Sequence, residues 1–204
     1  MDKHCAKLPT VIALAILLIV VAGGSTSAMA TALTYSVSDT ASGFLGPTPF
    51  TDAMVTVSAS GDSGNVMCGG GFCELDILTS ATVTIAGLGT ANFTDVMFVF
   101  DNQPSQVAGI GDNTCVGCRG SVLDTTNAVF GAYDLQSPIG PISGPVFFRP
   151  DLRYGTDMGL LQFTSAGDTS TFTASGEAVP EPASLMLLGT GLVSVVGFAR
   201  RRLS

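Results

Sequence analysis

Apolar and polar residues alternate one by one along several stretches in the middle of the chain, and this pattern constrains the fold most. The clearest stretch, residues 53–60, alternates Ala53, Val55, Val57 and Ala59 with Met54, Thr56, Ser58 and Ser60. The same alternation recurs at residues 82–85 and 171–174. Successive side chains of a β-strand point to opposite faces, so each stretch predicts a strand with one buried face and one wet face.

Turn-forming residues separate the predicted strands. Gly, Pro, Asn and Asp gather at residues 61–71, 102–120, 137–145 and 165–168, which are therefore expected to be loops. Further strands are predicted at residues 33–38, 75–78, 93–100, 128–133, 146–149 and 160–164. Residues 31–178 have no convincing helical stripe. The pattern predicts an all-β domain, a single antiparallel β-sandwich over residues 31–178, with a barrel as the alternative.

The first 30 residues have the organisation of a secretory signal peptide. Two lysines precede an unbroken apolar run at residues 11–22, and small residues then lead to Ala28-Met29-Ala30. Signal peptidase is expected to cut after Ala30, because Ala28 and Ala30 form an A-x-A cleavage site. The alternative is an uncleaved anchor, for which the apolar run is short. Cleavage would remove the only histidine and every lysine of the chain.

The C-terminal segment, residues 179–204, has three consecutive parts. Pro180, Glu181 and Pro182 precede the uncharged residues 183–199, and Arg200, Arg201 and Arg202 follow. A helix of this length covers roughly 25 Å, a minimal membrane span. Positive charge stays on the cytoplasmic side, so we expect one transmembrane helix with the C-terminus inside and residues 31–178 outside.

This tripartite order resembles the PEP-CTERM sorting signal, which the membrane protease-transpeptidase exosortase reads in Gram-negative bacteria. The resemblance implies export, anchoring in the inner membrane by the tail, cleavage near Pro180-Glu181-Pro182, and release or attachment at the cell surface. Such proteins often occur in bacteria that make extracellular polysaccharide. Residues 81–89, 98–103 and 132–144 also look like parts of a recurring exported PEP-CTERM domain. A plain single-pass anchor is the alternative reading of the tail.

Four cysteines remain after signal cleavage: Cys68, Cys73, Cys115 and Cys118. Their spacing suits either a structural zinc site or two disulfides. An exported protein meets an oxidising compartment, so disulfides are favoured. We predict the pairs Cys68–Cys73 and Cys115–Cys118, since intervening glycines permit tight closure, although a bridge between the two loops would close a longer stretch of chain. A redox-active CxxC is the functional alternative for the second pair.

Charge and residue usage restrict the chemistry of the exported part. Residues 31–178 contain 14 acidic and three basic residues, a net charge of −11. A surface of that sign does not track phosphates, so no nucleic-acid partner is expected. Without histidine or lysine, the usual general bases and activated nucleophiles are missing. The domain is therefore expected not to be an enzyme and to carry no cofactor.

Carboxylates leave two further possibilities open. Glu74 with Asp76, or Asp95 with Asp101, are nominal acid pairs for glycoside hydrolysis, although the chain has no tryptophan to stack on a sugar. Calcium is the other possibility, with hard oxygen ligands at Asp62, Asn65, Asp101, Asn102, Asp112 and Asn113. The chain has no D-x-D-x-D-G loop, and Asp and Asn commonly serve turns, so no metal is assigned.

These observations together predict an exported structural or interaction protein of the cell surface or extracellular matrix. Its expected partners are signal peptidase, the exosortase-type sorting protease and, before processing, the membrane. Extracellular polysaccharide is a further candidate partner. The alternative is a carbohydrate-binding or adhesin-type β-sandwich, with or without calcium. A secreted carbohydrate-active hydrolase is the remote alternative.

Overall fold

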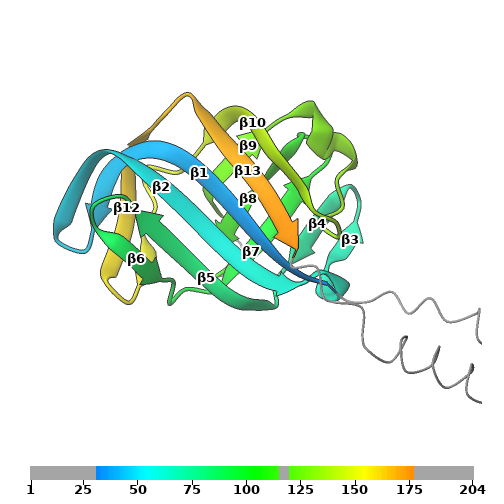
Figure 1. The fold of residues 1–204 in the computed structure, drawn as a ribbon, viewed down its shortest axis with the longest axis horizontal. Coiled ribbons are helices and arrows are strands. Elements are labelled where there is room, and N and C mark those ends of the chain that lie inside the picture. Colours follow the sequence, from blue (N-terminus) through cyan, green and yellow to red (C-terminus); the bar gives the residue numbers. More distant parts are fainter. Residues whose placement is uncertain (1–30, 115–119, 177–204) are drawn as a thin grey trace, which may run out of the picture. The chain divides into compact units, whose positions relative to one another are not determined.

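The computed structural model describes residues 31–114 and 120–176, and these are nearly all β-structure (Figure 1). The alternating pattern in the sequence therefore predicted the fold class correctly. Two short 3-10 helices also occur in this part of the chain, η1 (Ser63–Asn65) and η2 (Ala128–Ala132). The strands are β1 (Ala32–Leu45), β2 (Thr48–Asp62), β3 (Met67–Gly69), β4 (Phe72–Leu75), β5 (Leu78–Ile85), β6 (Gly89–Asn92), β7 (Met97–Asn102), β8 (Val107–Asp112), β9 (Gly120–Thr126), β10 (Ile139–Phe147), β11 (Tyr154–Thr156), β12 (Gly159–Ala166) and β13 (Thr169–Gly176).

The strands form one continuous antiparallel sheet. Its order is β3-β4-β7-β8-β9-β10-β13-β1-β2-β5-β6, while β12 pairs with β1 and with β11. Figure 1 shows β13, β1, β2 and β5 in a front layer, with β7, β8 and β9 crossing behind it. Strand β10 joins the layers, because it pairs with β13 on one side and with β9 on the other. The expected two layers are present, but they belong to one folded sheet.

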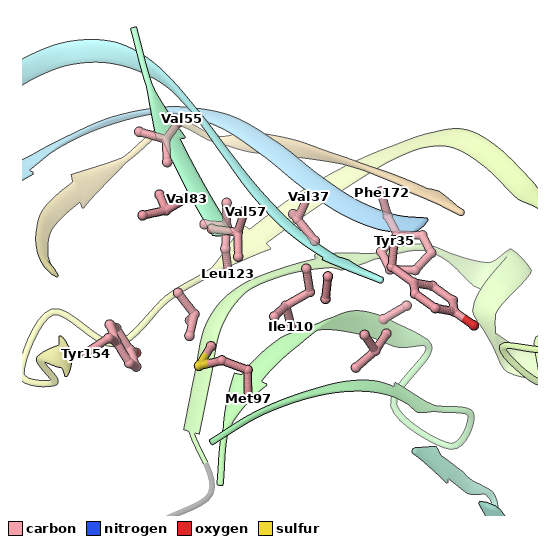
Figure 2. Packing of buried hydrophobic residues seen from close by; sticks show 14 of the residues in the cluster. Tyr35, Val37, Val55, Val57, Val83, Met97, Ile110, Leu123, Tyr154 and Phe172 are labelled. Carbon is pink, nitrogen blue, oxygen red and sulfur yellow. The ribbon is translucent and has the colours of Figure 1, made fainter. Parts of the chain in front are cut away.

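The core lies between the two layers. Val37, Val57 and Val83 are direct neighbours on β1, β2 and β5, and all three are fully buried. Figure 2 shows them facing Ile110 and Leu123 of the back layer. Burying a side chain of this kind stabilises the folded state by about 1.5–3 kcal/mol, so the inward half of the alternation supplies the main driving force for folding.

One end of the core is closed by η2 and the residues that follow it. Asn127 caps η2 by accepting a hydrogen bond from the Val129 N–H at 3.1 Å. Phe130 is completely buried, and the Tyr35 hydroxyl donates to the Leu135 carbonyl at 2.5 Å. The strand predicted at residues 128–133 is therefore wrong. The Asn127 cap and the buried rings of Phe130 and Tyr133, three residues apart, favour a short helix there. The apolar composition alone did not distinguish this helix from a strand.

Three strands, β3, β8 and β10, lie largely where the sequence predicted loops. The segments that contain β8 and β10 are rich in glycine, which is unfavourable inside strands. The close approach of neighbouring strands explains the glycines in these segments. A Cβ on Gly109 would lie 2.5 Å from the Asp124 Cβ, and one on Gly144 would lie 1.8 Å from the Thr126 carbonyl oxygen. Tertiary packing therefore requires glycine at positions where the local sequence indicates a turn.

Several sequence predictions concern residues outside the described part of the chain. These are the signal peptide at residues 1–30, the pair Cys115 and Cys118, and the C-terminal segment with its predicted membrane helix. Within residues 31–114 and 120–176, no helix has the length and hydropathy needed to span a membrane.

Candidate functional site

The outer surface of the front layer carries a regular array of hydroxyl groups, which we call the hydroxyl face. Its residues alternate with the core residues of the same strands, and no other element lies in front of these strands in Figure 1. The members are Thr34, Ser36 and Ser38 on β1, Thr56, Ser58 and Ser60 on β2, Ser80, Thr82 and Thr84 on β5, Thr90 on β6, Ser143 on β10, and Thr171, Thr173 and Ser175 on β13.

Strand register aligns these residues in rows across the sheet. In the middle row Ser36 lies opposite Ser58 on one side and Thr173 on the other, and Ser58 in turn lies opposite Thr82. The adjacent rows are built the same way, and the row through Ser38 extends from β10 to β6. Directly opposed residues point to the same side of a sheet, so the rows form a two-dimensional grid.

Hydrogen bonds between neighbouring strands fix several of these side chains. Hydroxyl oxygens are 2.8 Å apart in the pair Thr34 and Ser60, and 3.0 Å apart in the pair Ser38 and Thr56. The same contact joins Thr84 to Thr90 at 2.8 Å and Ser143 to Thr171 at 2.9 Å. Each hydroxyl has one donor and two acceptor positions, so such a pair retains hydrogen-bonding capacity toward a partner above the sheet.

The grid contains no charged side chain. The nearest acidic residues on β2 are Asp52 and Asp62, which lie beyond the two ends of its hydroxyl segment. The face is therefore a neutral area on an acidic domain. It offers hydrogen bonds without the titratable groups that acid–base catalysis requires.

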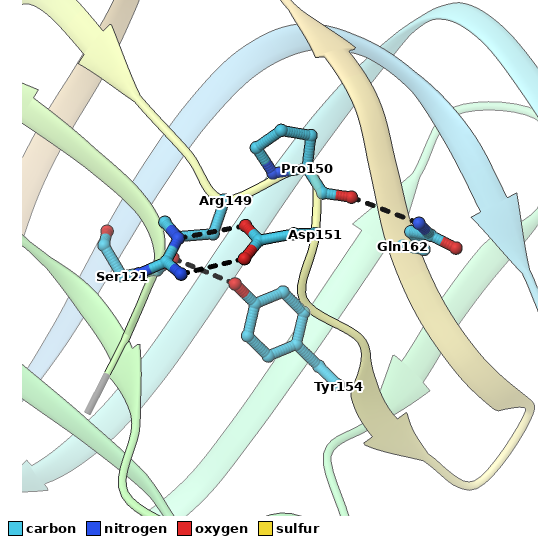
Figure 3. A network of polar contacts seen from close by, with 6 residues as sticks. All are labelled: Ser121, Arg149, Pro150, Asp151, Tyr154 and Gln162. Atoms are coloured by element: carbon cyan, nitrogen blue, oxygen red, sulfur yellow. Dashed lines mark hydrogen bonds and ion pairs between the residues drawn. The ribbon is translucent and has the colours of Figure 1, made fainter. Parts of the chain in front are cut away.

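The basic residues of the described chain, Arg149 and Arg153, belong to the connection between β10 and β11. Figure 3 shows the Arg149 guanidinium against the Asp151 carboxylate, 2.9 Å apart. Arg153 donates to the Gln162 side chain at 3.1 Å. In the same network the Tyr154 hydroxyl donates to the Ser121 carbonyl at 2.9 Å. These arginines therefore hold a loop and contribute no charge to the hydroxyl face.

Cys68 and Cys73 form a disulfide, as predicted, with Cα atoms 4.1 Å apart. They are direct partners on β3 and β4, so the bond closes a tight hairpin instead of lying in a loop. Because the two sulfurs are bonded to each other, neither is a thiolate that could bind zinc. The predicted pairing of Cys115 with Cys118 concerns residues outside the described part of the chain.

We expect all four cysteines of the exported protein to resist alkylation until a reductant is added. The Cys68–Cys73 hairpin bond and the oxidising compartment support this result. Mass spectrometry of the alkylated protein, before and after reduction, counts the free thiols. Labelling of Cys115 and Cys118 without reductant would contradict the second pair and leave the first intact.

The structure does not bring either nominal carboxylate pair together in a cleft. Glu74 lies on β4, and Asp101 is enclosed in the interior. Asp76 and Asp95, one from each pair, instead line a shallow hollow of about 230 Å³ beside Thr79 and Ser80. Asp95 accepts a hydrogen bond from the Gly155 N–H, so this carboxylate helps to hold β11.

The proposed calcium ligands mainly serve local turns. Asp62 accepts from the Gly64 N–H at 2.8 Å, Asp112 from the Thr114 N–H at 2.7 Å, and Asn102 from the Ser105 N–H at 3.3 Å. Among the residues that the structure describes, no three His, Cys, Asp or Glu side chains are grouped as metal ligands would be. The turn interpretation therefore explains these contacts.

Asp101 has an environment that the sequence did not indicate. It is completely buried on β7, and neither of its carboxylate oxygens has a hydrogen-bond partner within the described part of the chain. Burial, and then the charge of Asp134, raises the pKa of Asp101 to about 7. Burial also raises the pKa of Asp124 on β9, to about 6. Both carboxyls are buried in the folded domain, so their ionisation influences its stability.

Comparison with known families addresses the tail of the chain. A family model described as the PEP-CTERM protein-sorting motif matches residues 178–202. The chain carries a PEP-CTERM sorting motif. The match includes Pro180, Glu181 and Pro182, the apolar segment, and Arg200 to Arg202, which confirms the resemblance drawn from the sequence. No curated protein and no solved structure matches the chain.

The PEP-CTERM motif indicates how the chain is exported and sorted. Proteins with this motif are exported, held at the membrane by their tails and processed by exosortase. The motif spans residues 178–202, whereas the hydroxyl face belongs to β-strands that end at Gly176. Sorting and surface chemistry therefore reside in separate parts of the sequence.

Proposed function

We propose that this PEP-CTERM protein is a non-enzymatic structural or interaction protein of the cell surface or extracellular matrix. Signal peptidase removes residues 1–30, and exosortase cuts near Pro180-Glu181-Pro182. The exported domain, residues 31–178, then acts through its surface. The hydroxyl face is the observation that carries this role, because its Ser and Thr side chains are aligned in rows across β13, β1, β2 and β5.

The composition of that face supports interaction over catalysis. A catalytic site needs a group that accepts or donates protons or attacks a substrate, held in a pocket. The hydroxyl face is part of a sheet and contains only Ser and Thr, and the carboxylates of Asp62 and Asp157 lie at its edges. Asp101, the carboxyl with the pKa nearest neutrality, is enclosed between the layers. These features favour a protein that binds or assembles.

We expect Glu181→Ala to block processing of the tail while leaving the protein in the membrane. The apolar segment and Arg200 to Arg202 determine insertion and orientation, and the substitution leaves both unchanged. Cells that produce exosortase should release or attach the parent protein in a shortened form. They should retain the variant at full tail length, as measured by fractionation and intact mass.

A matched variant controls for changes near the cleavage region. Ala183→Ser lies next to the tripeptide but leaves Pro180, Glu181 and Pro182 in place, so it should be processed like the parent. Processing of the Glu181 variant at the parental rate would contradict the sorting role of the tripeptide. Recovery of the parent from the surface with both Met1 and Ser204 present would contradict the proposed route as a whole.

A further inference from the structure

We propose that the hydroxyl face is a docking surface for a neutral polysaccharide. The inference rests on the proposed interaction role and names the class of partner and the surface that binds it. The face spans strands from β10 to β6 in one row, with direct cross-strand neighbours throughout. An extended polymer can follow such a row, whereas a small ligand has no enclosing walls there.

Hydrogen-bonding chemistry argues for a partner that also carries hydroxyls. Every Ser or Thr on the face both donates and accepts, and a neutral sugar polymer presents the same two functions along its length. Neighbouring strands lie about 4.8 Å apart, and residues i and i+2 on a strand lie about 7 Å apart. The grid therefore offers many hydrogen-bonding groups at short and regular intervals.

Charge selects among polymers. The exported part has a net charge of −11, so a polyanion is repelled as it approaches. A polycation is attracted, but to carboxylates such as Asp52 and Asp62, which lie outside the grid. The grid itself has no charge to neutralise. A neutral polymer is therefore the partner whose charge matches the face.

Protein–protein recognition fits the same surface poorly. The energetic centres of protein interfaces are rich in Trp, Tyr and Arg, and Ser and Thr contribute little there. The hydroxyl face has none of the favoured residues. A second copy of this chain would also bring two acidic domains together. The face therefore favours a polysaccharide over a protein as its partner.

Order within the face lowers the entropy cost of binding. Four cross-strand hydroxyl pairs are already hydrogen-bonded, and the backbone beneath them belongs to a long paired sheet. Side chains that are held before binding lose less freedom when a ligand arrives. Single contacts with a neutral sugar are weak in water, so retention grows with the number of rows and protein copies that one polymer engages.

The test measures retention of the exported protein on insoluble neutral glucans, with microcrystalline cellulose and granular starch as probes. The decisive variant carries Ser58→Glu and Thr82→Glu. These residues are direct neighbours in the middle row, so two carboxylates would occupy the centre of the face. Apparent affinity for the retaining glucan is expected to fall at least about tenfold, which corresponds to about 1.4 kcal/mol.

Two further proteins separate binding from folding and from net charge. Ser105→Glu with Gln136→Glu adds the same charge at exposed positions outside the face, and this control should bind like the parent. Thr56→Val with Thr82→Val removes two hydroxyls while keeping β-branched side chains that suit strands. It should remain folded and bind several-fold more weakly. Circular dichroism and thermal unfolding of every variant establish the folded state.

The possible outcomes distinguish this inference from the proposed function. The proposed docking surface would be contradicted if neither glucan retains the parent protein. It would also be contradicted if both face variants are retained as strongly as the parent. A parent dimer that dissociates in the Ser58 and Thr82 variant would assign the face to a second copy and would equally overturn it. In either case, normal exosortase-dependent processing would still support the proposed function as a sorted surface protein, because processing does not involve this face.

Discussion

Phe172→Ala should lower the free energy of unfolding by about 3–5 kcal/mol, the largest single effect that we expect in this domain. Phe172 lies on β13, is completely buried, and contacts the residues that close one end of the core. Its ring centroid is 5.4 Å from that of Phe130, 6.1 Å from that of Tyr133 and 6.5 Å from that of Tyr35. Removal of the ring leaves a cavity among these three partners.

Chemical denaturation of the exported protein measures this loss. Domains of this size typically have total stabilities of about 5–15 kcal/mol, so the variant is expected to be marginal and to melt roughly 10 °C lower. Phe147→Ala is the matched control, because Phe147 lies on β10 with 54% of its surface exposed. Its effect should stay below about 1 kcal/mol. Equal losses in the two variants would contradict the described end of the core.

Asp101→Asn should stabilise the domain by an amount that grows with pH and reaches about 3 kcal/mol at pH 8 relative to pH 4. The reason is the buried, unpaired carboxyl, whose pKa is raised to about 7 by burial and by the charge of Asp134. Above pH 4 the unfolded chain releases this proton, while the folded chain keeps it until about pH 7. The unfolding free energy of the parent therefore falls as pH rises across this window.

Asparagine removes this titration, because it is neutral at every pH. The quantity to compare is the change in unfolding free energy between pH 4 and pH 8, since this difference cancels the fixed effect of replacing a carboxyl with an amide. Asp124, with its pKa raised to about 6, contributes a fall of the same sign in both proteins. An identical pH dependence of parent and variant would contradict the buried environment of Asp101.

Asp134→Asn gives an independent check on the cause. Asp134 is exposed, and its charge is the second contribution to the raised pKa of Asp101 after burial. Neutralising Asp134 should lower the pKa of Asp101 in the folded state and bring it closer to the pKa in the unfolded chain. The decline of the unfolding free energy with rising pH should therefore become smaller. The effect should be weaker than that of Asp101→Asn, because burial is the larger contribution and is unchanged.

The sequence by itself determined which residues face inward and outward along the most regular strands. The alternation at residues 53–60, 82–85 and 171–174 predicted β2, β5 and β13, because side chains in a strand alternate between two faces. The sorting motif was equally accessible, since it consists of a contiguous tripeptide, an apolar segment and an arginine cluster. The Cys68–Cys73 bond was predicted correctly because the glycines between the two cysteines permit tight closure.

Tertiary structure alone decided the features that depend on distant parts of the chain. Neighbouring strands approach Gly109 and Gly144 too closely to admit a Cβ, so these strand positions require glycine, and the local sequence does not show this requirement. Asp101 is buried because β7 lies inside the folded sheet, although the strand predicted from the sequence ends at residue 100, just before it. The hydroxyl face exists because strand register aligns Ser36, Ser58 and Thr82, and register is fixed by which apolar faces pack together.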